Sequence, residues 1–85
     1  MKQITMFYLP SCPYCRKAIG WNEELRAEQP EYAALEIKMV DESREKALAE
    51  SFDYYYVPCY YVDGEKLHEG AATKEKIEEV FKAAL

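Results

Sequence analysis

The feature that most constrains the fold is a cysteine pair placed between an apolar run and a helical pattern. Cys12 and Cys15 stand three positions apart, and residues 4–9 before them (Ile-Thr-Met-Phe-Tyr-Leu) are mostly apolar and aromatic. A short run of this kind fits a strand that is covered on both faces. Pro13 suits the first turn of a helix, where its missing N–H is no loss. The sequence therefore predicts a strand, a tight connection and a helix that begins at the cysteines.

Apolar side chains at near-helical spacing predict that this helix covers residues 14–29 and ends at Pro30. The side chains that define the spacing are Ala18, Ile19, Trp21 or Asn22, and Leu25. Residues 35–40 alternate between apolar and polar and predict a second strand. Asp41 or Ser43 is expected to cap a short second helix that runs to about position 51.

The second half of the chain predicts a hairpin and a closing helix. Val57-Pro58 precedes a strand over residues 59–62, and Asp63-Gly64 is a strong hairpin turn that leads into a strand over residues 66–68. Thr73 offers an N-cap for the last helix. The inner face of that helix is predicted at Ile77, Val80, Phe81 and Leu85.

These elements follow the order β-α-β-α-β-β-α, which belongs to the α/β class. A β-α-β unit crosses over right-handedly and gives parallel strands, and the hairpin adds antiparallel ones. The sequence thus predicts a four-stranded mixed sheet with helices on both faces. Its 85 residues suffice for a single domain over 1–85, with a thin core and a site at its surface.

Composition and charge exclude several classes of function. Hydrophobic residues make up 49% of the chain and charged residues 32%, which indicates a globular protein. The net charge is -5 and basic residues are interleaved with acids, so nucleic acid is not an expected partner. We find no secretory signal at the start and no stretch near the ~20 apolar residues of a membrane span. We therefore expect a cytoplasmic monomer.

The spacing of Cys12 and Cys15 indicates thiol–disulfide chemistry. A sulfur attacks as the thiolate, and the unpaired N–H groups at a helix start stabilise that anion. Arg16 and Lys17 in the next turn are expected either to add positive potential or to point into solvent. We expect Cys12 to be the exposed nucleophile and Cys15, one turn further on, to be the more buried thiol that resolves a mixed disulfide.

The cysteines also raise the questions of a zinc site and of the role of Cys59. A zinc site would need more ligands, and Cys59 and His68 supply no second tight ligand pair, so no metal is expected. For Cys59 we favour a small apolar side chain at a strand start over a third thiol that traps partners. His68 is expected at the surface, because its neighbours Lys66 and Glu69 are polar.

The segment Cys12-Pro13-Tyr14-Cys15 resembles the motif of dithiol glutaredoxins, and the element order is similar to the minimal thioredoxin fold. The resemblance covers essentially the whole chain. It implies a thiol–disulfide oxidoreductase that reduces protein or glutathione mixed disulfides, with glutathione as a co-substrate and no bound cofactor. It further implies that Pro58 is cis and that the Val57 backbone pairs with substrate.

Three departures from the glutaredoxin pattern leave the electron donor open between glutathione and thioredoxin reductase. Leu9 stands where a basic residue is usual, and Tyr56 stands where threonine is usual. The Gly-Gly-x-Asp segment becomes Glu-Gly-Ala-Ala-Thr over residues 69–73, so that Gly70 and Thr73 remain to hold a glutathione carboxylate. The buried acid of thioredoxin is also missing, since Met6 occupies its place.

The alternatives are a reductase-coupled donor to one protein, such as a ribonucleotide reductase, and a dithiol sensor or binding module without turnover. A run of three tyrosines, Tyr54 to Tyr56, precedes Val57 and fits either core packing or a substrate surface. Among the aromatic side chains, Tyr14 and Tyr56 are the best candidates for substrate contact.

Overall fold

Four strands form one mixed sheet in the computed structural model, which describes residues 1–85. In chain order the elements are β1 (Ile4–Tyr8), α1 (Pro13–Glu28), α2 (Pro30–Ala33), β2 (Ile37–Asp41), α3 (Lys46–Glu50), β3 (Cys59–Val62), β4 (Glu65–Glu69) and α4 (Lys74–Ala84). The strand order is β2-β1-β3-β4. β1 pairs with β2 in parallel, whereas β3 is antiparallel to both β1 and β4. The predicted α/β fold class and sheet are confirmed.

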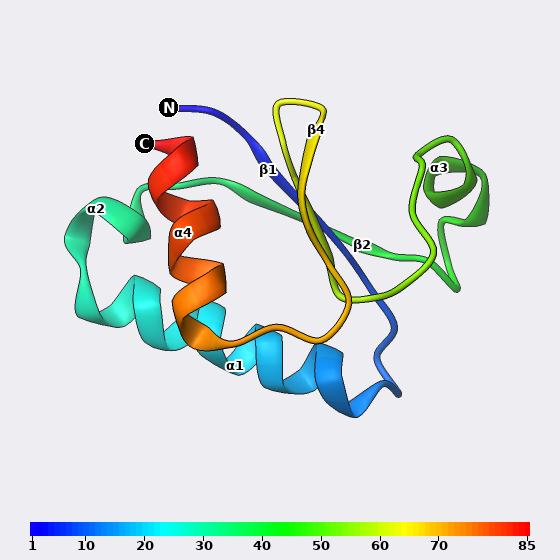
Figure 1. The fold of residues 1–85 in the computed structure, drawn as a ribbon, viewed down its shortest axis with the longest axis horizontal. Coiled ribbons are helices and arrows are strands. Elements are labelled where there is room, and N and C mark those ends of the chain that lie inside the picture. The colour runs from blue at the N-terminus through cyan, green and yellow to red at the C-terminus, as the bar shows by residue number, and fades with distance from the viewer.

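The two faces of the sheet carry cores of different size. The larger core has 12 buried residues and joins Ile4 and Met6 of β1 to α1, α2 and α4. The smaller core has 5 buried residues, among them Phe7 of β1, Cys59 of β3 and Ala49 of α3. Figure 1 shows α1, α2 and α4 grouped together and α3 lying apart from them. This division follows from the period of two along β1, which sends successive side chains to opposite faces.

Three local signals fold as the sequence predicts. Pro13 is the first residue of α1. The Thr73 hydroxyl accepts a hydrogen bond from the N–H of Lys76 at 3.2 Å and so caps α4. Asp63 and Gly64 both have positive φ, at 48° and 83°, which the two-residue turn between β3 and β4 requires.

In the middle of the chain one short helix was not predicted, and the predicted cap of another is wrong. Pro30 ends α1, as expected, but it also begins α2, which the sequence analysis did not predict. The N-cap of α3 is Glu45, without a side-chain bond, rather than Asp41 or Ser43. The Asp41 carboxylate instead accepts from the N–H and the hydroxyl of Ser43, at 3.0 and 2.6 Å. That local turn occupies the groups that capping would have used.

The inner face of α4 also differs at its end. Ile77, Val80 and Phe81 are buried as predicted, but Leu85 is 47% exposed and Ala84 is buried in its place. The helix ends at Ala84, so the helical period no longer directs the last side chain toward the core. No helix of the structure has the length and apolar character that crossing a membrane requires.

Candidate active site

The connection from β1 to α1 places Cys12 at the N-cap of the helix. Its backbone is extended, with φ -80° and ψ 121°, and its N–H donates to the Leu9 carbonyl at 3.1 Å. Its own carbonyl accepts the first hydrogen bond of the helix, from the N–H of Arg16 at 3.0 Å. The Cys12 sulfur is therefore attached where the first N–H groups of α1 have no partner within the helix.

This position favours the thiolate form of Cys12. The side chain is half-buried, and it makes no capping hydrogen bond to the helix. The N–H of Cys15 does most to lower the pKa of the Cys12 thiol; the Cys15 thiol, the N–H of Tyr14 and the Arg16 charge lower it further, against a rise from partial burial. Helix N–H groups and a nearby cation are the usual means by which proteins activate a cysteine.

Cys15 lies one turn further along α1 in the opposite kind of environment. Its side chain has no exposed surface. Burial raises the pKa of the Cys15 thiol to about 11, and the proximity of Cys12 raises it as well. The structure thus confirms the predicted contrast between an accessible Cys12 and a buried Cys15. Both are free thiols.

The segment before β3 lies at the same edge of the sheet as Cys12. β1 and β3 are antiparallel neighbours, and Phe7 near the end of β1 pairs with Cys59 at the start of β3. The Val57-Pro58 peptide bond directly before Cys59 is cis, as the resemblance implied, and Pro58 is buried. The topology therefore places the segment before β3, residues 54–58, at the same edge of the sheet as Cys12.

Cys59 belongs to the smaller core. It is fully buried, and burial raises the pKa of its thiol to about 12. Both observations agree with the favoured reading of Cys59 as a small apolar side chain. Across the whole chain, no three His, Cys, Asp or Glu side chains are grouped closely enough to hold a metal ion.

The three consecutive tyrosines separate into two roles. Tyr54 stacks on Phe7 with ring centroids 4.7 Å apart, and its hydroxyl donates to Glu42. Tyr55 and Tyr56 are 85% and 70% exposed. Core packing therefore accounts for the first tyrosine, whereas the rings of the other two are exposed to solvent before Val57. Tyr14, between the active-site cysteines, is exposed as well.

The two positions expected to hold a glutathione carboxylate are engaged within the protein. The N–H of Gly70 donates to the Pro58 carbonyl at 2.9 Å. The Thr73 hydroxyl caps α4, as described above. His68, expected at the surface, is half-buried, and its Nε2 lies 3.0 Å from the Gly70 carbonyl and 3.2 Å from that of Ala71.

An open hollow of about 680 Å³ lies between α3 and the segment before Tyr56, with Leu9 at its edge. Its charged lining consists of Glu42, Glu50 and Lys46, so acids outnumber bases beside Leu9. The electrostatics of this hollow do not favour an anionic ligand.

Sequence analysis missed a buried polar network behind the site. The Asn22 amide donates to the sulfur of Met6 at 3.2 Å and accepts from the Tyr60 hydroxyl at 2.8 Å. Asn22 is only 3% exposed, so it, and not Trp21, takes the inward position on α1. A polar residue at core spacing was the only signal in the sequence. Glu69, which accepts hydrogen bonds from the segment before Val57, was not predicted from the sequence either.

Comparison with known proteins identifies the family of this chain. A family model described as Glutaredoxin matches residues 4–67. The chain belongs to the glutaredoxin family. A thioredoxin from Methanocaldococcus jannaschii is also similar to this glutaredoxin-family chain, with 32% identity over 83 residues, which are 98% of this chain and 95% of that protein.

Solved structures of thioredoxins share the fold of this glutaredoxin-family chain. Thioredoxin from Malassezia sympodialis superposes with a TM-score of 0.78 at 15% identity, over 98% of this chain and 74% of that one. Thioredoxin from Fasciola hepatica gives 0.74 at 22% identity, over 99% and 81%. Family and fold together support a thiol–disulfide oxidoreductase in general.

Proposed function

We propose that this protein reduces disulfide bonds of other proteins through Cys12 and Cys15, in the reducing environment of the cytoplasm and without a bound cofactor. The observation that carries the proposal is the contrast within one helical turn. Cys12 is accessible and its pKa is lowered, whereas Cys15 is buried and its pKa is raised to about 11. Such a pair separates an attacking thiolate from a thiol that reacts only after the first step.

The reaction proceeds in two exchanges. The Cys12 thiolate attacks one sulfur of the substrate disulfide, and the other substrate sulfur leaves as a thiolate that takes up a proton. Cys15 then loses its proton and attacks the Cys12 sulfur, which releases the second substrate thiolate. Two electrons pass to the substrate, and the protein is left with a Cys12–Cys15 disulfide.

The surroundings of Cys12 supply a surface for the substrate. Tyr14 and Tyr56 are exposed aromatic side chains, and the backbone of Val57 precedes the buried Pro58. Aromatic rings give adaptable apolar contact at a small entropic cost, which suits the binding of varied peptide segments. We propose that these side chains and the Val57 backbone align the substrate disulfide with the Cys12 sulfur.

The test is reduction of a disulfide-containing peptide by the pre-reduced protein, followed as thiol release. The native protein should release two thiols per molecule, and Cys12→Ser should release none. Lys17→Ser serves as the matched control, since Lys17 is an exposed residue of the same helix. A native protein that releases no thiol would instead favour the sensor or binding module.

For the electron supply, specific observations favour a reductase-type protein partner over glutathione. The N–H of Gly70 is already bonded to Pro58, and the hollow beside Leu9 carries more acid than base. The similar protein from M. jannaschii is named a thioredoxin. We therefore propose that thioredoxin reductase reduces the oxidised protein, and that glutathione is the competing electron donor. One dedicated substrate, such as a ribonucleotide reductase, would fit the same supply.

This second proposal is tested by reducing the oxidised protein with glutathione or with NADPH and thioredoxin reductase. Fast reduction by the reductase and slow reduction by glutathione are expected. If glutathione alone reduces the protein rapidly, residues 69–73 still form a tripeptide site and the reductase proposal is wrong.

A further inference from the structure

Tyr54 and Val57 pack against the smaller core, but the two residues between them, Tyr55 and Tyr56, are held by polar contacts. Tyr55 and Tyr56 are 85% and 70% exposed, so their rings bury little surface that could fix the backbone. Neither residue lies in a helix or strand. The backbone at these two residues therefore depends on contacts other than the packing of their own side chains.

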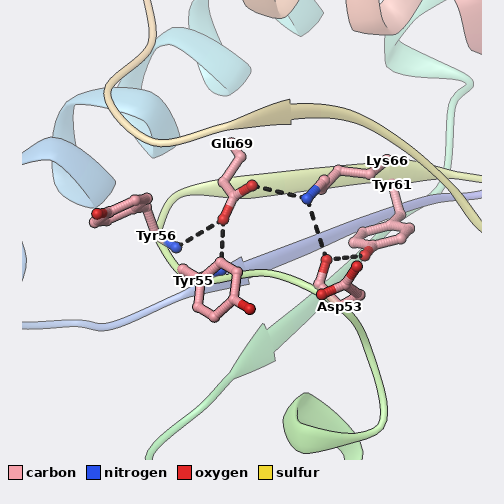
Figure 2. A network of polar contacts seen from close by, with 6 residues as sticks. All are labelled: Asp53, Tyr55, Tyr56, Tyr61, Lys66 and Glu69. Atoms are coloured by element: carbon pink, nitrogen blue, oxygen red, sulfur yellow. Dashed lines mark hydrogen bonds and ion pairs between the residues drawn. The ribbon is translucent and has the colours of Figure 1, made fainter.

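One carboxylate supplies these contacts. Oε2 of Glu69, at the end of β4, accepts hydrogen bonds from the backbone N–H of both Tyr55 and Tyr56, the second at 3.0 Å (Figure 2). The other oxygen, Oε1, receives the Lys66 ammonium at 2.8 Å. Hydrogen bonds to an ionised acceptor are roughly twice as strong as neutral ones. The three donors, Lys66 first, lower the pKa of Glu69 to about 2.

The same end of β4 also holds the other side of Val57. The N–H of Gly70 donates to the Pro58 carbonyl at 2.9 Å, and the ideal Cβ position of Gly70 lies 3.8 Å from Cβ of Tyr56. The backbone is thus anchored before Val57 by Glu69, the last residue of β4, and at Pro58 by Gly70, which follows that strand. The β3–β4 pairing, in which Cys59 stands opposite Glu69, places both anchors there.

Lys66 extends the network to the start of the segment. Its ammonium lies 3.3 Å from the carbonyl of Asp53, which also accepts a hydrogen bond from the Tyr61 hydroxyl at 2.6 Å. Figure 2 shows these groups converging on the loop from β3 and β4. The loop over residues 53–56 is therefore bonded at both of its ends.

We propose that Glu69 is a positioning residue, which fixes the Tyr55–Tyr56 backbone and thereby the Val57 backbone that receives the substrate. This inference rests on the proposed disulfide reduction. Glu69 is not a catalytic residue, since it bonds to neither Cys12 nor Cys15. It acts by restricting the conformations of the loop before the substrate binds. Preorganised loops bind more tightly because this entropy has already been removed.

The experiment compares Glu69→Ala and Glu69→Gln with the native protein in three measurements: hydrogen exchange at the Tyr55 and Tyr56 amides, steady-state reduction of a disulfide peptide, and alkylation of Cys12 by iodoacetamide. Glu65→Gln is the matched control, because Glu65 is an exposed carboxylate of the same strand. For Glu69→Ala we expect faster exchange at both amides and a KM raised about tenfold, with kcat within about twofold.

Glu69→Gln should fall between the native protein and Glu69→Ala, since the amide oxygen still accepts a hydrogen bond but carries no charge. Glu65→Gln and the alkylation rate should not change, which excludes a general loss of structure. Unchanged amide exchange in Glu69→Ala, or faster exchange with an unchanged KM, would overturn the positioning role. A native protein without any disulfide reduction would overturn the proposed function instead, so the two failures are distinguishable.

Discussion

Cys12 and Cys59 are two thiols at the same edge of the sheet with opposite chemistry. Cys12 is the N-cap of a helix, half-buried, with a pKa below its usual value. Cys59 begins a strand directly after Pro58, is fully buried, and has a pKa of about 12. What separates them is the supply of unpaired N–H groups and solvent, since Cys12 lies at a helix start and Cys59 is paired within the sheet. Because the two side chains are chemically identical, we expect their different positions in the fold to decide which thiol reacts.

The largest expected difference is in alkylation of the native protein. At neutral pH, Cys12 should react with iodoacetamide at least about a thousandfold faster than Cys59, because Cys59 must become exposed before it can react. Residue-resolved mass spectrometry measures both rates. In urea the two rates should converge. Rapid native alkylation of Cys59 would show that the buried thiol is accessible and would break the comparison.

A smaller effect is expected in the stability of the reduced protein at alkaline pH. An unfolded cysteine ionises near pH 9.0, whereas burial keeps Cys59 protonated to about pH 12 in the folded chain. Above pH 9 the unfolded state therefore binds fewer protons, and the free energy of unfolding falls as pH rises. Cys59→Ala removes this contribution.

Relative to neutral pH, the Cys59→Ala variant should lose about 1 kcal/mol less stability at pH 10 than the native protein. Urea unfolding at pH 7 and pH 10 measures the difference. An equal loss in both proteins would mean that Cys59 does not resist ionisation in the folded state.

The smallest effect concerns the charge beside Cys12. The charge of Arg16 lowers the pKa of the Cys12 thiol. Arg16→Glu should raise the midpoint of the pH profile of Cys12 alkylation and slow the reaction at pH 7 about threefold. Lys17→Glu makes the same change of charge one residue further on and should have a smaller effect. Equal effects of the two variants would mean that net charge, rather than the position of Arg16, sets the reactivity.

The sequence predicted those features that neighbouring residues determine. Pro13 at the start of α1, the Asp63-Gly64 turn and the Thr73 cap each depend on a few adjacent positions, and all three are confirmed. The contrast between Cys12 and Cys15 followed from the same local reasoning, because Cys12 stands at the helix start and Cys15 lies one turn further along the helix.

Features that depend on distant contacts were missed, and two local features were predicted wrongly. The bonds from Tyr55 and Tyr56 to Glu69 span 14 and 13 positions and exist only in the β3–β4 register. The cap of α3 went wrong because Asp41 bonds to Ser43 instead. Leu85 was assigned to the core by periodicity, although the helix ends before it. Local pattern does not report these competing partners.

The most direct test of the central claim is to trap the intermediate. Cys15→Ser removes the resolving thiol and leaves Cys12 and Cys59 in place. After reaction with a disulfide peptide, intact mass and fragmentation should locate one peptide adduct on Cys12, stable until a reductant is added. An adduct on Cys59, or no adduct at all, would contradict the assignment of Cys12 as the nucleophile.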